Sequence, residues 1–230
     1  MGHLVSSAEL HLQTLFECDA AGRILCTREP ACSSGPAFSI VRSREKCAWA
    51  VHSQVNPSLA AELDRLAAEE SPARDFQDPP MHAARYMALL GEDVYHGPAL
   101  AFPETIIRPS GIEFIESLDL LMSNFRGWTA LEIPDRQPIA GVVQDNRAVS
   151  ICFCARRSDV AAEAGLETAA PFRGRGLGAR VTAAWAIAIR ETGRIPLYST
   201  SWSNHSSLAV ARKLRLVTYA SNWSVRLNGD

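Results

Sequence analysis

The stretch that decides the fold reads Glu163-Ala-Gly-Leu-Glu167-Thr-Ala-Ala-Pro-Phe-Arg173-Gly-Arg-Gly-Leu-Gly178. Its three alternating glycines expose backbone N–H groups that side chains would otherwise cover. The positions that follow recur at the spacing of one helix face: Leu177, Val181, Ala184, Trp185 and Ala188. A glycine turn that opens into a helix N-terminus beside two arginines is an anion site by geometry. The stretch therefore predicts a partner that carries phosphate.

Strands and helices alternate around this turn. Val160–Thr168 is predicted to be the strand that leads into it, and Leu177–Arg190 the helix that leaves it. The other elements predicted in this half are a helix over Ile112–Phe125, strands over Trp128–Ile133, Ile139–Gln144, Ala148–Ala155 and Leu197–Trp202, a helix over Ser206–Leu214, and strands near Val217 and Val225. This order predicts a mixed α/β fold.

The first half of the chain has a pattern of its own. Its predicted elements are a hairpin strand over Arg23–Cys26, strands over Phe38–Val41 and Ala48–Val51, helices from Pro57 and over Met81–Leu90, and a strand over Tyr95–Phe102. Proline and glycine then interrupt the chain over Pro103–Gly111. We therefore predict a boundary there, with regions 1–105 and 106–230 on either side.

Three kinds of cofactor site are built on a glycine turn before a helix. A dinucleotide site requires G-x-G-x-x-G and an acidic residue about 20 positions on, but Ala179 interrupts the pattern and Glu191 precedes the next strand. A P-loop requires a lysine that this turn lacks. An acyl-coenzyme A site requires only backbone amides and arginines for its pyrophosphate. The alternative without a ligand is a plain strand-to-helix turn with exposed arginines.

Arg173-Gly-Arg-Gly-Leu-Gly178 resembles the signature of the GNAT superfamily of acetyl-CoA-dependent N-acyltransferases, in which Arg or Gln precedes x-x-Gly-x-Gly or Ala. Asn204-His-Ser-Ser207 resembles the asparagine and small residues that follow the fifth strand of that family. The resemblance implies an α/β (α+β) fold with a mixed, centrally antiparallel sheet flanked by helices. Residues 106–230 would be the catalytic domain that binds acetyl-CoA. Residues 1–105 would be a smaller α+β region, on the acceptor side or as a GNAT-like subdomain.

The resemblance also implies a function, an acyltransferase that moves an acetyl group from acetyl-CoA to a small primary amine or amino-acid-like acceptor by direct attack. The residues implied in binding acetyl-CoA are Leu166, Thr168, Arg173, Gly174, Arg175, Gly176, Leu177, Gly178, Ala179, Asn204 and Ser207. Surface charge alone would also explain the arginine side chains, and an N-cap would explain Asn204. Ala211 departs from the family, since many members carry a tyrosine there that is thought to protonate the departing thiolate. This departure favours a second interpretation, a non-catalytic module that binds or senses acyl-CoA.

Two carboxylates on the predicted strand are candidates for the catalytic base. An amine must be neutral to attack a thioester, so a nearby carboxylate or histidine should accept its proton. Glu163 and Glu167 are four residues apart and therefore lie on one face of the strand. Carboxylates on such an apolar strand are costly unless they are exposed, paired or used. We place Glu163 first because it lies further from the glycine turn than Glu167. The acyl end of an extended cofactor should reach this more distant part of the strand.

Composition limits the other possibilities. The 230 residues are 47% apolar and 21% charged with a net charge of −2, so no basic field indicates nucleic acid. The six histidines have no metal-ligand spacing, and we expect no metal. The first residues lack a basic start and a continuous apolar run, so we expect no signal peptide. With nothing that marks secretion, we expect reduced cysteines and a cytoplasmic location. The longest uncharged apolar run, Ala183–Ile189, is too short to span a bilayer. The expected partner is a small amine, and a homodimer stays open.

Overall fold

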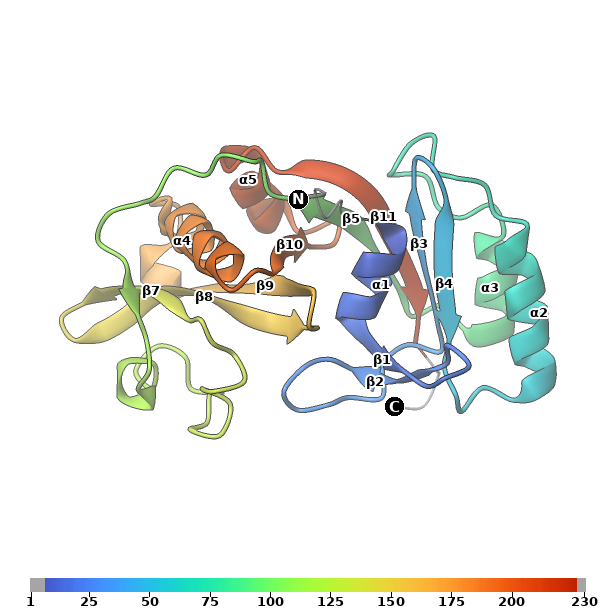
Figure 1. The fold of residues 1–230 in the computed structure, drawn as a ribbon, viewed down its shortest axis with the longest axis horizontal. Helices are drawn as coiled ribbons and strands as arrows, with labels where there is room; N and C mark the ends of the chain where they lie inside the picture. The colour runs from blue at the N-terminus through green and yellow to red at the C-terminus, as the bar shows by residue number, and fades with distance from the viewer. Residues whose placement is uncertain (1–6, 227–230) are drawn as a thin grey trace.

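The computed structural model describes residues 7–226, and within this range nine strands form one sheet (Figure 1). These strands are β3 (Phe38–Ser43), β4 (Cys47–Val51), β5 (Val94–Ala101), β6 (Glu113–Phe114), β7 (Ala140–Gln144), β8 (Arg147–Arg157), β9 (Ala161–Thr168), β10 (Ile195–Ser199) and β11 (Val217–Val225). Their order across the sheet is β4-β3-β11-β5-β10-β9-β8-β7-β6. Every neighbouring pair is antiparallel except β9 with β10. The mixed α/β fold that the sequence predicted is confirmed.

Helices cover both faces of the sheet. They are α1 (Ala8–Leu15), α2 (Pro57–Ala68), α3 (Ala83–Leu90), α4 (Leu177–Glu191) and α5 (His205–Lys213). Ile40 packs in the cluster with α2 and α3, whereas its neighbour Val41 packs with α1. Successive side chains of a strand point to opposite faces, so α1 lies on the other face from α2 and α3. Leu100 on β5 packs in the cluster of α4 and α5, while Ala99 packs with α1, so α4 and α5 also lie opposite α1.

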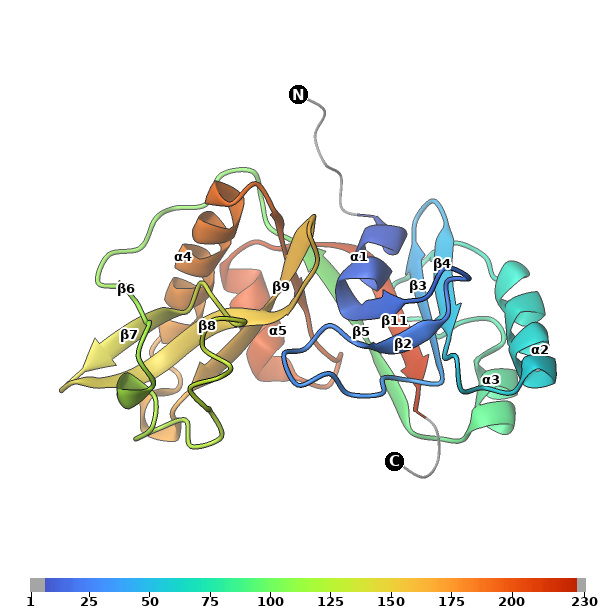
Figure 2. The same cartoon turned by 60° about the horizontal axis from the view of Figure 1, so that its bottom comes forward.

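The two halves of the chain share this sheet. Strand β5, from the first half, lies between β10 and β11 of the second and pairs with both. A second, two-stranded sheet of β1 (Phe16–Cys18) and β2 (Ile24–Thr27) continues from α1. Figure 2 shows α1 beside β9, so the first half covers one face of the second. The boundary at residue 105 stays a prediction about folding units, but the sheet is continuous across it.

The parallel strands β9 and β10 separate soon after they meet. They pair from Ala161 opposite Ile195 to Glu163 opposite Leu197. The rest of β9, from Ala164 to Thr168, pairs only with β8 on its other side. Glu163 therefore stands at the point where the two strands part. The open edge of β9 runs from there toward the glycine turn.

Two sequence predictions in the segment before β7 are wrong. Ile112–Phe125 is not a helix: it contains β6, which pairs with β7, and a short 3-10 helix over Leu118–Leu120 capped by Ser117. Trp128–Ile133 is a series of turns and not a strand. Five apolar residues of these stretches are buried in one cluster with residues of β8, without regular structure: Ile115, Leu121, Phe125, Trp128 and Ile133. Phe114, Met122 and Leu131 stay exposed. The C-terminal strands predicted near Val217 and Val225 are one continuous strand, β11.

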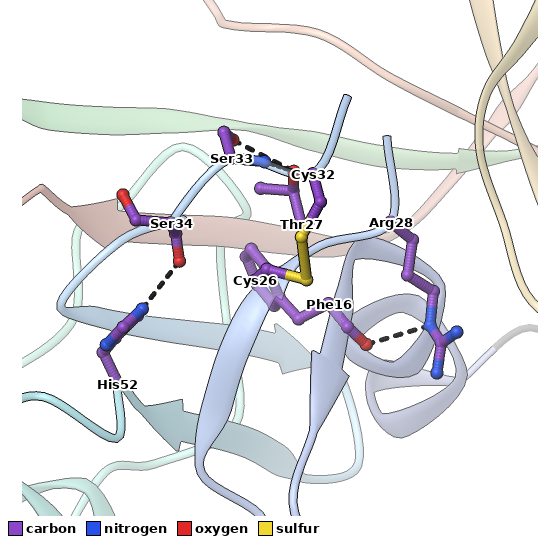
Figure 3. The surroundings of a disulfide bond; sticks show 8 residues. All are labelled: Phe16, Cys26, Thr27, Arg28, Cys32, Ser33, Ser34 and His52. Carbon is purple, nitrogen blue, oxygen red and sulfur yellow. Dashed lines mark hydrogen bonds between the residues drawn. A yellow bond between two sulfur atoms is a disulfide. The ribbon is translucent and has the colours of Figure 1, made fainter. Parts of the chain in front are cut away.

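The expectation of reduced cysteines is also wrong for one pair. Cys26 at the end of β2 and Cys32 form a disulfide, because the turn between them brings their Cα atoms to 5.9 Å (Figure 3). Within the described residues the other four cysteines are free thiols. Cys152 and Cys154 are buried beneath α4, and burial raises the pKa of both thiols.

Candidate functional site

The glycine turn places a helix N-terminus at the surface. Gly174 and Gly176 both have a φ of 75°, in the left-handed region that glycine adopts without steric cost. Gly176 is the N-cap of α4, and among the described residues no side chain donates or accepts a capping hydrogen bond there. The first N–H groups of α4 are therefore free to bind an anion, which the helix dipole also favours.

A lysine that the sequence analysis did not single out lies against this turn. A Cβ atom built on Gly176 would collide with the ammonium group of Lys213, near the end of α5. The glycine thus leaves room for a cation directly beside the uncapped helix N-terminus. One signal was available, because Lys213 is one of only two lysines in 230 residues. The structure adds this residue to the predicted anion site.

The arginines of the turn are exposed and lie close to its backbone. Arg173 donates from Nε to the carbonyl oxygen of Thr168 at 3.0 Å, and this bond ties the turn to the end of β9. The guanidinium of Arg175 lies 5.2 Å from the ring centroid of Phe172, within cation–π range. Both side chains keep further N–H donors for a phosphate.

The open edge of β9 and the start of α4 are packed closely together. A Cβ atom on Gly178 would lie 3.3 Å from Leu166 and 3.5 Å from Val210, so this glycine allows the helix to approach the strand. Leu177 and Ala179 are buried beneath the turn. The hydroxyl of Thr168 lies 2.7 Å from that of Ser150. These predicted cofactor residues are thus brought to one edge, from Leu166 to the glycine turn.

Asn204 and Ser207 lie at the start of α5 and have partners within the protein. The side chain of Asn204 is the N-cap of α5 and accepts a hydrogen bond from the Ser207 N–H at 3.0 Å. The Ser207 hydroxyl lies 2.6 Å from the hydroxyl of buried Tyr198 on β10. Burial raises the pKa of Tyr198 to about 12, against which the bond to Ser207 acts. The capping role that the sequence left open for Asn204 is therefore present.

Glu163 is buried in a charged cluster. Its side chain is only 3% exposed, and its Oε2 lies 2.6 Å from Nη1 of Arg156. Ser199 on β10 donates a hydrogen bond to the other oxygen. Burial raises the pKa of Glu163, but Arg156, His11 and the bond from Ser199 together outweigh it and leave the pKa below its ordinary value. Glu163 is thus a carboxylate at neutral pH, held at the point where β9 and β10 part.

Helix α1 and strand β11 complete the surroundings of this carboxylate. His11 is fully buried, and its Nδ1 lies 2.9 Å from the Tyr219 hydroxyl. Its Nε2 is also buried and has no hydrogen-bond partner among the described residues. Burial lowers the pKa of His11, although Glu163 acts in the opposite direction. Burial and the charge of Glu163 raise the pKa of Tyr95 to about 12. His11 and Arg156 could not be found from the sequence, because only the fold brings them to Glu163.

Glu167 lies on the same face of β9 but in a different environment. It is exposed, and it accepts a hydrogen bond from the indole nitrogen of Trp128 at 3.4 Å. The prediction that the two glutamates share a face agrees with the register of β9. Of the two glutamates, only Glu163 lies at the junction of the parallel strands.

Within residues 7–226 no cluster of side chains suits a metal ion, and no helix is both long and apolar enough to cross a bilayer.

Comparison with known families gives a match to one part of the chain. A family model described as FR47-like protein matches residues 140–224, which include β7 to β10, the glycine turn and Glu163. A search of curated proteins gives no match.

Among solved structures, a GNAT-family protein from Novosphingobium aromaticivorans is 22% identical over 57% of this chain and 63% of its own, with a TM-score of 0.47. A GCN5-related N-acetyltransferase from Kribbella flavida is 18% identical over 65% of each chain, with a TM-score of 0.47. A GCN5-related N-acetyltransferase-like protein from Streptococcus suis is 14% identical over 84% of this chain and 85% of its own, with a TM-score of 0.46.

The chain spans slightly less than two thirds of the Novosphingobium and Kribbella proteins. The match to residues 140–224 covers the stretch in which the glycine motif predicted a GNAT relationship. The FR47-like match thus falls on the part of the chain that carries the glycine turn and Glu163.

Proposed function

We propose that this protein is an N-acetyltransferase that moves an acetyl group from acetyl-CoA to a small primary amine or amino-acid-like acceptor. The observation that carries the proposal is the continuous path from the uncapped N-terminus of α4, along the open edge of β9, to the buried carboxylate of Glu163. One end of this path suits an anion and the other suits proton transfer. The family match over residues 140–224 supports the same reaction class.

The anion end fits the pyrophosphate of a CoA thioester. Backbone N–H groups from Gly174 to Gly178 would hold its oxygens, with Lys213, Arg173 and Arg175 as cations around them. A Cβ atom at Gly176 would collide with the ammonium group of Lys213, so the glycine keeps this cation directly beside the uncapped N-terminus of α4, where a phosphate would bind. The pantetheine arm would follow β9 past Thr168 and Leu166, where the edge has no partner strand.

The reaction would be a direct attack at the point where β9 and β10 separate. The amine nitrogen forms a bond to the thioester carbon, and the carbon–sulfur bond breaks to release the thiolate. Glu163 would accept the amine proton, directly or through water, and Ser199 and Arg156 would hold the carboxylate in place. Backbone N–H groups of β9 could bind the developing oxyanion. Glu167 is the alternate base, on the same face of the strand.

A second function, binding or sensing of acyl-CoA without turnover, is favoured by two observations. Ala211 is buried at the position where many GNAT members have a tyrosine, and the carboxylate of Glu163 already has an ion-pair partner. Calorimetry with acetyl-CoA, followed by mass spectrometry of products from a broad amine panel, separates the two. Binding with an acetylated product supports the enzyme. Binding without any product supports the sensing module, and no binding refutes both.

A further inference from the structure

A cavity of about 230 Å³ lies beside the buried charged cluster, between the disulfide loop and the end of β8. The first half of the chain contributes Glu17 and residues 26–30 and 32, and the second contributes Asp135 and residues 154–157. A space of this volume is below the usual range of sites for drug-sized ligands and therefore suits a small metabolite. Because both halves form its wall, the cavity exists only when they pack together.

Arg156 connects this cavity to the proposed base. Its guanidinium is paired with Glu29 on the loop side and with Glu163 on the buried side, at 2.6 Å from the latter. Its Nε is buried and has no hydrogen-bond partner in the described part of the chain. A ligand in the cavity would therefore contact the residue that holds the carboxylate of Glu163.

The charges around the cavity favour a cation. Its lining holds three carboxylates and three arginines, and the carboxylate of Glu163 behind Arg156 leaves an excess of one negative charge. The Nε of Arg28 is already occupied, because it donates to the carbonyl oxygens of Gln13 and Phe16. Figure 3 shows the bond to Phe16. Arg157 is paired with Asp135 at 3.4 Å. An ammonium group is a small cation that would offset this excess negative charge.

The disulfide holds the loop that carries Glu29. Cys26 and Cys32 close a short loop, and both line the cavity. At its base the Thr27 N–H donates to the Ser33 carbonyl at 2.8 Å. The His52 ring lies 2.7 Å from the Ser34 carbonyl oxygen (Figure 3). Between these anchors the disulfide is the covalent link that sets the path of the loop, and with it the position of the Glu29 carboxylate.

We propose that this cavity binds the acceptor as its ammonium form, and that the Cys26–Cys32 disulfide holds its wall in place. The inference rests on the proposed function and deepens it. A dithiol reductant would convert the disulfide to two thiols and would itself become a disulfide, in a balanced two-electron exchange. The loop would then be held only by its hydrogen bonds, Glu29 would no longer be fixed against Arg156, and acceptor binding would weaken.

The first test establishes the disulfide and uses acetyl-CoA as an independent control. Mass spectrometry of the purified, unreduced protein should find a peptide that links Cys26 to Cys32. Calorimetry of the wild-type protein and of every variant measures acetyl-CoA affinity, which should not change. If the wild-type protein does not bind acetyl-CoA, the proposed function fails. If it binds acetyl-CoA but contains no such disulfide, the wall proposal alone fails.

The second test measures the acceptor. The probes are the standard amino acids and short aliphatic amines, followed by saturation-transfer NMR for binding and by product mass spectrometry for KM. We expect Cys26→Ser with Cys32→Ser, Glu29→Gln, and the reduced wild-type protein each to weaken binding about 10-fold, the loss of one charged contact. Cys18→Ser, a free thiol outside the cavity, is the matched control and should behave as wild type with or without reductant.

The outcomes are distinct. Weaker binding in the three altered forms, with acetyl-CoA affinity retained, supports the proposal. Unchanged acceptor binding in Glu29→Gln and in the reduced protein would overturn it, because neither the charge nor the wall would then matter. If the double cysteine variant fails to fold, Glu29→Gln, which keeps the disulfide, decides the outcome alone.

Discussion

Replacing Glu163 with glutamine tests the most specific chemical claim. Gln occupies the same volume and can still accept the hydrogen bond from Ser199, but it cannot accept a proton from the acceptor amine. Loss of a general base typically lowers a rate about 10²–10⁴-fold. We therefore expect kcat of Glu163→Gln to fall by this order, with partial recovery at higher pH, where more of the free amine is neutral.

The same substitution should also lower stability. Removing one partner of a buried ion pair can cost about 3–5 kcal/mol, but here Arg156 keeps Glu29 and its side chain is 27% exposed. We therefore expect a smaller loss, about 1.5–3 kcal/mol, the range for a lost hydrogen bond to a charged group. The folded-state pKa of Glu163 is lowered, so its stabilising effect is complete above the unfolded-state pKa of about 4.3 and is lost as pH falls through the folded-state value. The stability difference between wild type and variant should shrink in acid.

Steady-state kinetics across pH, acetyl-CoA calorimetry and urea unfolding measure these effects together. Glu167→Gln is the matched control, since it removes an exposed carboxylate from the same face of β9. The expected result is a loss of kcat in Glu163→Gln with unchanged acetyl-CoA affinity, and little change in the control. If Glu163→Gln keeps its kcat at every pH, Glu163 is not the base. A loss confined to Glu167→Gln would assign the role to that residue.

Three further predictions follow from the site and the sheet. Gly176→Glu should abolish acetyl-CoA binding in calorimetry while the protein stays folded at a cost of about 1–2 kcal/mol for its left-handed backbone; a folded variant with wild-type affinity would contradict this. Lys213→Met should weaken acetyl-CoA binding about 10-fold, with a smaller effect in high salt, whereas exposed Arg212→Met should not; equal effects of both would indicate only general charge. A chain that begins near Ile106 should not fold stably, because β10 and β11 would lose β5 between them; a cooperative thermal transition with full activity would refute this.

The sequence predicted the elements around the glycine turn because their signals are local. Alternating glycines followed by an apolar helix face determine the turn and α4 without help from the rest of the chain. Asp145 and Asn146 form the turn between β7 and β8, and both adopt the positive φ that such hairpin turns require. The segment from Ile112 to Ile133 was predicted wrongly, because its buried apolar residues pack in a cluster with β8 without forming a long helix or the predicted strand.

The surroundings of Glu163 could not be predicted from the sequence because they are assembled over long distances. His11, Arg156 and Ser199 come from α1, β8 and β10, and no local pattern joins them. The sequence placed Glu163 and Glu167 on one face of β9, but the burial that distinguishes them depends on α1 packing there (Figure 2). The disulfide was missed for the same reason, since six scattered cysteines do not reveal which pair the fold brings together.

The most direct measurement of the central claim is a titration of the purified protein with acetyl-CoA. Isothermal calorimetry on the wild-type protein and on Gly176→Glu, with native mass spectrometry for co-purified CoA, asks whether the glycine turn is a CoA site. We predict one saturable site in the wild-type protein and none in the variant. Equal binding by both proteins, or binding by neither, would contradict the account.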